Sequence, residues 1–229
     1  MTQTDSRARW GAALVAVAPL VAAAGLVMHP FLPFVPDAEA IADAVVAQPT
    51  RWAVAHFVFA VGATLLATAF VTIRSYLRDA GENRWSGWAL PFAVLGSAIF
   101  AILPGLEFAP YAAAETGGDV AATQEALFPY FIPLLVSGAV FFAVGAIGFA
   151  RAILASGVMS RGTALVVATS LVVLAIARFV PLGVVQFYVH GAAALVALWP
   201  IAATMWGRRE LEMVVQPAPR SRSLEPSEA

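Results

Sequence analysis

Long apolar blocks separated by short polar segments extend from residue 10 to residue 206. A transmembrane helix needs about 20 mainly apolar residues to cross the hydrocarbon core of a bilayer. A spanning segment must also satisfy its own backbone hydrogen bonds, which favours helices. Six blocks approach this length and contain no Asp, Glu or Lys: 10–28, 52–73, 88–105, 128–150, 162–180 and 183–206. The pattern predicts an all-α, polytopic membrane bundle with six transmembrane helices over residues 10–206.

The composition supports this class and restricts the chemistry. Hydrophobic residues make up 61% of the chain and charged residues 12%, whereas soluble domains average about 45–50% and about 25%. The chain has no cysteine, which excludes disulfides, thiolate metal ligands and iron–sulfur clusters. It also has no lysine, so no retinal or pyridoxal Schiff base can form.

The arginines predict the orientation, because cytoplasmic loops of membrane proteins retain Lys and Arg. With the amino terminus inside, the cytoplasmic side carries Arg7, Arg9, Arg74, Arg78, Arg84, Arg151, Arg161, Arg208, Arg209, Arg220 and Arg222. The outer loops carry Asp37, Glu39, Asp43, Glu107, Glu115, Asp119 and Glu125. We therefore expect a multi-pass protein of the cell membrane, an inner membrane in a bacterium, with both termini cytoplasmic. The lipid bilayer is its expected partner, a homo-oligomer or a partner membrane subunit stays open, and the net charge of −1 gives no indication of nucleic acid.

The segments outside the spans are a cytoplasmic amino terminus (1–9), two outer loops (29–51 and 107–127) and a cytoplasmic carboxy-terminal segment (207–229). Each outer loop contains an alanine-rich stretch. Asp37 and Asp119 are the expected caps of a short surface helix in each loop, because an N-cap side chain accepts hydrogen bonds from the first turn. The tail from about residue 216 is rich in Pro, Ser and charge, and is predicted to be disordered.

Five ionisable residues gather near the outer ends of the predicted spans. His29 ends the first span, and Glu107 follows the third. His56, Arg178 and His190 lie inside the second, fifth and sixth spans. At 1.5 Å of rise per residue, all five belong to the outer third of the bundle. Because such groups are costly in a membrane and usually face the bundle interior, a functional site is the default hypothesis.

These residues permit three interpretations. In the first, His29, His56, Glu107 and His190 bind a divalent metal ion such as Zn or Cu, which imidazole and carboxylate ligands suit. In the second, His56 and His190 are axial ligands of haem b and Arg178 lies near its propionates. In the third, His56 and His190 are neutral and hydrogen-bonded across helices, and His29 and Glu107 are ordinary interface residues. Arg178 then extends to the outer headgroups. No H-E-x-x-H or C-x-x-C-H motif supports a cofactor, so its identity stays open.

A stripe on the second span permits two explanations. His56, Ala60, Thr64, Thr68 and Thr72 recur at every fourth residue, and this spacing places them along one slowly winding helix face. Hydroxyls below a histidine are compatible with a water or proton path. The stronger interpretation is that each threonine bonds back to a carbonyl of its own helix, as is common in membrane helices.

The fourth span contains "LLVSGAVFFAVGA", and its Ser137-Gly138 pair with Gly145 resembles the nucleophile helix of rhomboid intramembrane serine proteases. The resemblance implies that Ser137 is the nucleophile, that His190 is its base and that His56 helps to bind the oxyanion. Such a site has a physical rationale, since the base must reach the hydroxyl and donors must face the developing charge. The sequence departs from the family at Leu135, Ala60, Ala193 and Ala197, where the family has glycine, asparagine and two glycines.

A second resemblance rests on His29-Pro30, the acidic first loop and "PTRWAVAH". This combination resembles multi-pass bacterial membrane proteins of unknown function, which imply no activity. The sequence therefore favours an outward-facing His/Glu site that binds a metal ion or haem, and whether the protein is an enzyme stays open. The alternatives are the protease, a structural or accessory subunit, and a transporter with spans interrupted by Pro19, Pro91, Pro104, Pro133 and Pro200.

Overall fold

The computed structural model describes residues 3–215, and most of these residues are helical. Its elements are α1 (Gln3–Met28), α2 (Ala38–Ala47), α3 (Pro49–Asp79), α4 (Trp85–Leu106), α5 (Phe108–Thr116), α6 (Val120–Ser156), α7 (Arg161–Ala177), the π-helix η1 (Val184–Val189) and α8 (His190–Val215). Within this range the only β-type pairing is an isolated bridge between Phe34 and Leu182. The tail predicted to be disordered from about residue 216 lies outside the described residues.

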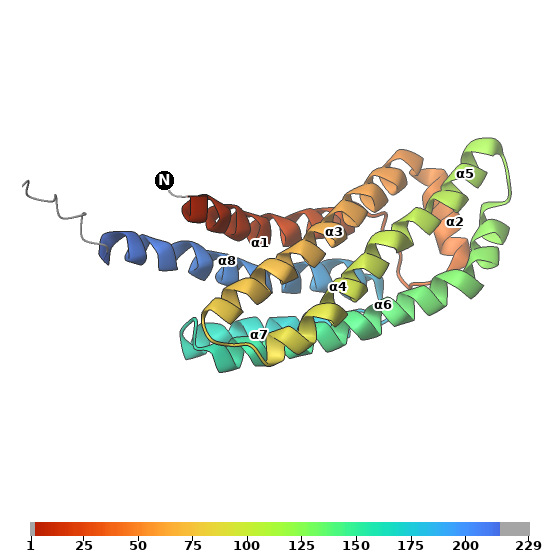
Figure 1. Cartoon of the computed structure of the whole chain (residues 1–229). Helices are drawn as coiled ribbons and strands as arrows, with labels where there is room; N and C mark the ends of the chain where they lie inside the picture. The colour runs from red at the N-terminus through yellow and green to blue at the C-terminus, as the bar shows by residue number, and fades with distance from the viewer. Residues whose placement is uncertain (1–2, 216–229) are drawn as a thin grey trace, which may run out of the picture.

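The six longest α-helices lie side by side in a bundle, and α2 and α5 lie together at one end (Figure 1). The main contacts join α4 with α6, α1 with α3, α3 with α4, α1 with α8, α6 with α7, and α7 with α8. The beginning of α1 and the loops after α3 and α6 lie at the opposite end from α2 and α5 (Figure 1).

The predicted all-helical membrane bundle is confirmed in its main feature. Five helical segments are long and apolar enough to cross a membrane: Arg9–Met28, Pro49–Asp79, Trp85–Thr116, Val120–Ser156 and Val184–Gly207. The predicted span 162–180 forms the shorter apolar helix α7, which ends at Ala177. Arg178 is therefore the C-cap residue of α7 instead of lying inside a helix.

Both aspartates predicted as helix caps do cap a helix, but only one of them caps the short helix that was predicted. Asp37 caps the short helix α2 as predicted, since its side chain accepts a hydrogen bond from the Ala40 amide. Asp119 also acts as an N-cap, with the Ala122 amide as donor at 2.9 Å, but the helix it starts is the long α6. The short helix of the second loop, α5, lies upstream instead and ends at Gly117, whose φ of 73° suits glycine.

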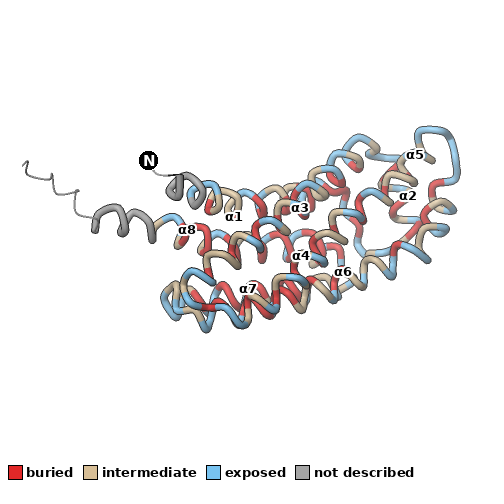
Figure 2. The backbone as a smooth tube through the Cα atoms, viewed as in Figure 1, coloured by how far each residue is buried: buried red, intermediate tan, exposed pale blue. Residues whose placement is uncertain are grey.

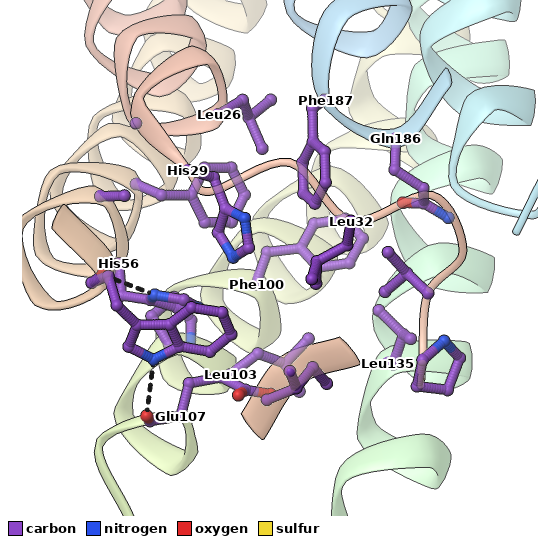
Figure 3. A pocket seen from close by; sticks show the side chains of 18 of the residues that line it. Leu26, His29, Leu32, His56, Phe100, Leu103, Glu107, Leu135, Gln186 and Phe187 are labelled. Atoms are coloured by element: carbon purple, nitrogen blue, oxygen red, sulfur yellow. Dashed lines mark hydrogen bonds between the residues drawn. The ribbon is translucent and has the colours of Figure 1, made fainter. Parts of the chain in front are cut away.

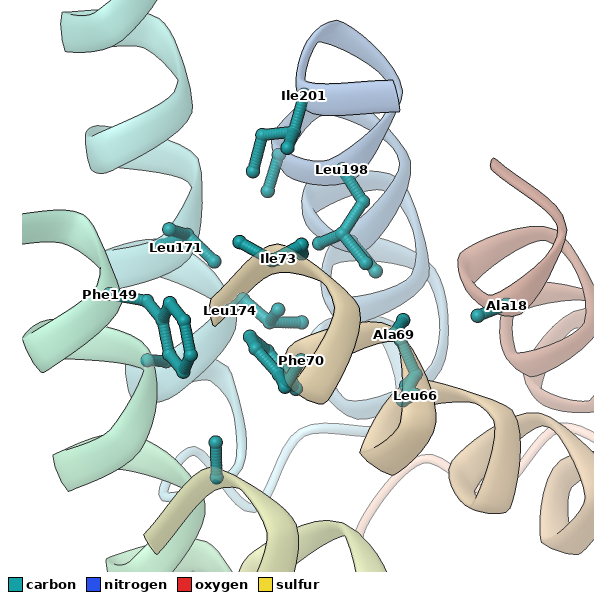
Figure 4. Close-up of a cluster of buried hydrophobic side chains, with 14 of the residues drawn as sticks. Ala18, Leu66, Ala69, Phe70, Ile73, Phe149, Leu171, Leu174, Leu198 and Ile201 are labelled. Atoms are coloured by element: carbon teal, nitrogen blue, oxygen red, sulfur yellow. The ribbon is translucent and has the colours of Figure 1, made fainter. Parts of the chain in front are cut away.

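Small residues allow the central helices to approach closely. A Cβ atom on Gly145 would lie 2.6 Å from the Cα of Ala93, and one on Gly96 would lie 2.6 Å from the Cα of Phe142. The contact between α4 and α6 is therefore a contact between backbones, which small residues permit in membrane helices. Buried residues form the interior of the bundle (Figure 2), where the Phe70 and Phe149 rings lie 4.9 Å apart (Figure 4).

The loop after α1 is tied to the loop after α7. The Val35 amide donates to the Pro181 carbonyl at 3.1 Å, and the Gly183 amide donates to the Pro33 carbonyl at 2.9 Å. A Cβ on Gly183 would collide with the Leu32 carbonyl oxygen, so this approach requires glycine. The two loops together cover the end of the bundle that holds the candidate site.

Candidate functional site

A cavity of about 100 Å³ lies in the end of the bundle near α2 and the loop after α1 (Figure 3). Its wall takes residues from α1, α2, α3, α4, α6 and η1 and is mainly apolar. The polar side chains in the wall are His29, His56, Glu107, Arg178 and Gln186. A single water needs about 10–15 Å³, so the cavity has room for a small molecule.

Two histidines and a tryptophan form one wall (Figure 3). The ring centroids of His29 and His56 lie 4.8 Å apart, and each ring also packs on Trp52. The Nδ1 atoms of His29 and His56 are hydrogen-bonded to the Pro30 and Trp52 carbonyls at 2.6 and 2.8 Å. Because a carbonyl only accepts, each Nδ1 carries the proton, and Nε2 is the acceptor nitrogen.

His29, which follows the first span, is neutral at physiological pH. Burial, and then repulsion from His56, lower the pKa of His29 to about 3 from its ordinary value of 6.5. Its ring stacks on Phe187 with a centroid distance of 4.6 Å. The wall therefore presents neutral aromatic surface with an acceptor nitrogen.

The cavity wall also contains a buried carboxyl group. Glu107 is 5% exposed, and its Oε1 accepts a long hydrogen bond of 3.4 Å from Gln124, which is fully buried. The Glu107 carbonyl accepts from the Trp52 indole at 3.0 Å, which fixes the chain at the end of α4 (Figure 3). Glu107 Oε2 and Gln124 Oε1 are buried without a hydrogen-bond partner. These two oxygens could therefore accept hydrogen bonds that the described residues do not supply.

Arg178 and Gln186 form the opposite wall. Arg178 Nη1 donates to Gln186 Oε1 at 3.3 Å, while Gln186 Nε2 donates to the carbonyls of Arg178 and Val180 at 3.0 and 2.9 Å. Nε and Nη2 of Arg178 are buried without a partner. These atoms are buried beside the cavity instead of pointing outward from the bundle, which differs from the packing interpretation of the sequence.

His190 lies apart from this cavity. It is 4% exposed, packs 6.3 Å from the Phe142 ring in the bundle core, and is hydrogen-bonded to the backbone of Leu174. Of the four predicted metal ligands, His29, His56 and Glu107 line the cavity and His190 does not. Among the described residues, no group of three or more His, Cys, Asp or Glu side chains is placed to hold a metal ion. His56 and His190, the predicted haem ligands, do not share this cavity.

The hydroxyl groups singled out in the sequence bond to their own helices. Ser137 donates to the Pro133 carbonyl at 2.6 Å, and Ser137 does not line the cavity. Thr64, Thr68 and Thr72 donate to carbonyls three or four residues earlier. The back-bonding interpretation of the threonine stripe is therefore confirmed.

Sequence reasoning missed two glutamines, Gln124 and Gln186. Gln186 lies inside the apolar block 183–206, and an amide within a membrane span is itself a signal of a polar interaction. No protein-family model, curated protein or solved structure matches this chain. The geometry of the cavity is therefore the main indication of function.

Proposed function

We propose that this chain is a six-span integral membrane protein, with both termini cytoplasmic, whose outward-facing pocket binds a small and mainly apolar organic molecule. Five long apolar helices and the shorter apolar α7 support six spans. The arginines cluster at the end of the bundle that carries the loops after α3 and α6, which supports a cytoplasmic position for that end. The pocket then lies near the outer surface.

The observation that carries the binding function is the pairing of apolar walls with unused polar atoms. Small-molecule sites are typically apolar cavities in which a few placed polar groups fix the ligand. Here Glu107 and Arg178 line the cavity, and each has buried polar atoms without a partner. Buried polar atoms are normally satisfied, so a ligand with polar groups at these positions would complete the site.

An organic ligand accounts for the geometry better than a metal ion or haem. Both of those interpretations depend on His190, which lies in the core beside Phe142. The cavity histidines instead present aromatic faces, with His29 stacked on Phe187. Aromatic and aliphatic walls suit the body of an organic molecule.

The test replaces a leucine of the cavity wall with a larger side chain that occupies the cavity. Leu135 lines the cavity, whereas the adjacent Leu134 does not, and both are half-buried on α6. Wild type, Leu135→Phe and Leu134→Phe are purified from the same cells, and their organic extracts are compared by mass spectrometry, with elemental analysis of each sample. We expect a compound in near-stoichiometric amount on wild type and Leu134→Phe, and most of it lost from Leu135→Phe.

Two results would contradict the proposal. The same compounds in equal amounts on all three proteins would indicate surface-bound lipid only. Stoichiometric metal without an organic compound would favour the His/Glu metal interpretation instead.

A further inference from the structure

The guanidinium of Arg178 lies over two aromatic rings. Its central carbon lies 5.2 Å from the centroid of the Phe59 ring and 4.9 Å from that of Phe100. Cation–π contact of this kind stabilises the charge. The N–H groups of a guanidinium lie in its plane, so it donates hydrogen bonds from its edges.

One edge is already engaged, and the other is free. Nη1 donates to Gln186, whose amide nitrogen is anchored on two backbone carbonyls. Nε and Nη2 have no partner, and these two atoms donate side by side from the same edge of the planar group. Such a pair of parallel N–H donors matches the two oxygens of a carboxylate or phosphate.

No carboxylate within residues 3–215 forms an ion pair with this edge. Among the residues the structure describes, the one ion pair joins the exposed Arg78 and Asp79. Glu107 lines the same cavity but forms no ion pair with Arg178. A buried cation without a partner is strongly unfavourable, so the free edge is better explained as a binding surface than as packing.

We propose that Nε and Nη2 of Arg178 bind the two oxygens of an anionic headgroup, a carboxylate or phosphate carried on an apolar body. This inference rests on the proposed ligand pocket and specifies its ligand as an apolar acid. Gln186 is the positioning residue that turns the free edge toward the cavity. The apolar wall, with Leu103, Leu135 and Phe187, receives the body of the ligand.

The experiment uses the full chain in phosphatidylcholine nanodiscs and isothermal titration calorimetry, with empty nanodiscs as blanks. The probes are hexanoate, hexyl phosphate and the neutral ester methyl hexanoate. Wild type should bind an anionic probe at least about tenfold more tightly than the ester, because hydrogen bonds to a charged group are stronger than those to a neutral one. Preference for hexanoate identifies a free acid, and preference for hexyl phosphate identifies a lipid-like phosphate; both support the inference.

Arg178→Lys keeps the charge and removes the paired donors, so the preference for the anion should fall by about tenfold. Arg161→Lys is the matched control, because Arg161 is exposed and lies at the opposite end of the bundle from the cavity. This variant should keep the preference for the anionic probe. If wild type binds the ester as tightly as the anions, the inference is overturned while the pocket stands. If no probe binds wild type, the inference and the proposed pocket both fail. The wild-type comparison decides even if Arg178→Lys does not fold.

Discussion

At the scale of single residues, the environment of His29 determines its protonation and its role. The ring is stacked on Phe187 and hydrogen-bonded to the Pro30 carbonyl. Burial lowers the pKa of His29 to about 3, so the folded protein holds the neutral form. A neutral ring can accept a hydrogen bond from a ligand, whereas a protonated ring would be repelled by Arg51.

Acid should therefore destabilise the protein through His29. The unfolded chain takes up a proton below pH 6.5, whereas the folded chain does so only near pH 3. Stability is thus independent of this group above pH 6.5 and falls by about 1.4 kcal/mol per pH unit between the two values. Thermal melting of wild type and His29→Gln in detergent measures this dependence on pH. The stability of wild type relative to the variant should fall as the pH falls. A constant difference across this range would disprove the assignment.

The sequence predicted part of the site because residue counts give depth along a helix. His29, His56 and Glu107 were expected at one level of the bundle, and they line one cavity. The direction in which a residue points around its helix was not predictable for His190. It follows directly on the π-helix η1, whose extra residues per turn rotate the helix that follows.

A second residue, in the loop between α3 and α4, stabilises the start of α4. Glu82 lies between α3 and α4 and accepts hydrogen bonds from the Trp85 and Ser86 amides at 2.7 and 3.1 Å. Burial raises the pKa of Glu82, but hydrogen bonds from the Ser86 hydroxyl and these amides outweigh it and leave the pKa below its ordinary value. The carboxylate thus satisfies the first turn of α4, where negative charge is favourable.

Glu82→Ala should destabilise the protein by about 0.5–2 kcal/mol, the usual cost of losing a helix cap. Because the folded pKa is lowered, this contribution is present above the ordinary pKa of a glutamate and is lost as the pH falls through the folded pKa. Chemical unfolding near neutral pH and in acid measures both effects. Glu125→Ala, at an exposed glutamate, is the control and should change stability by less than about 0.5 kcal/mol. Equal losses in the two variants would refute the capping role.

At the scale of elements, the sequence predicted which segments are helical, but it predicted the ends of the helices less accurately. The six apolar blocks all became helical, but α3 and α6 extend beyond the predicted 52–73 and 128–150. The reason is that helix ends depend on caps such as Asp119, whereas hydropathy reports only the part within the membrane. The short α7 ends at Ala177, and this places Arg178 where its side chain can reach the cavity.

The closest helix pair gives a sharp test of packing. Gly145 faces the backbone of Ala93, so Gly145→Ala would force α4 and α6 apart and should cost about 1–3 kcal/mol. Gly162 on α7 has open space around its Cα, and Gly162→Ala should be neutral or slightly stabilising. Thermal melting of the two variants compares them. If Gly145→Ala melts as wild type does, the close α4–α6 approach is wrong.

At the scale of the whole molecule, orientation decides what the pocket can meet. The wild-type chain has no cysteine, so single cysteines report position without background. Thr116→Cys, at the end of α5, and Ser160→Cys, before α7, are both exposed and lie at opposite ends of the bundle. In intact cells a membrane-impermeant maleimide should label Thr116→Cys and not Ser160→Cys. The reverse pattern would place the pocket on the cytoplasmic side.

The measurement that tests the central claim most directly is an experimental structure of the full chain in lipid nanodiscs, at a resolution that shows side chains and bound molecules. We expect density for a non-protein molecule in the cavity, with its headgroup on the Nε–Nη2 edge of Arg178 and its body against the apolar wall. A direct ion pair between Arg178 and Glu107, with the cavity closed around it, would show that the site does not bind such a ligand.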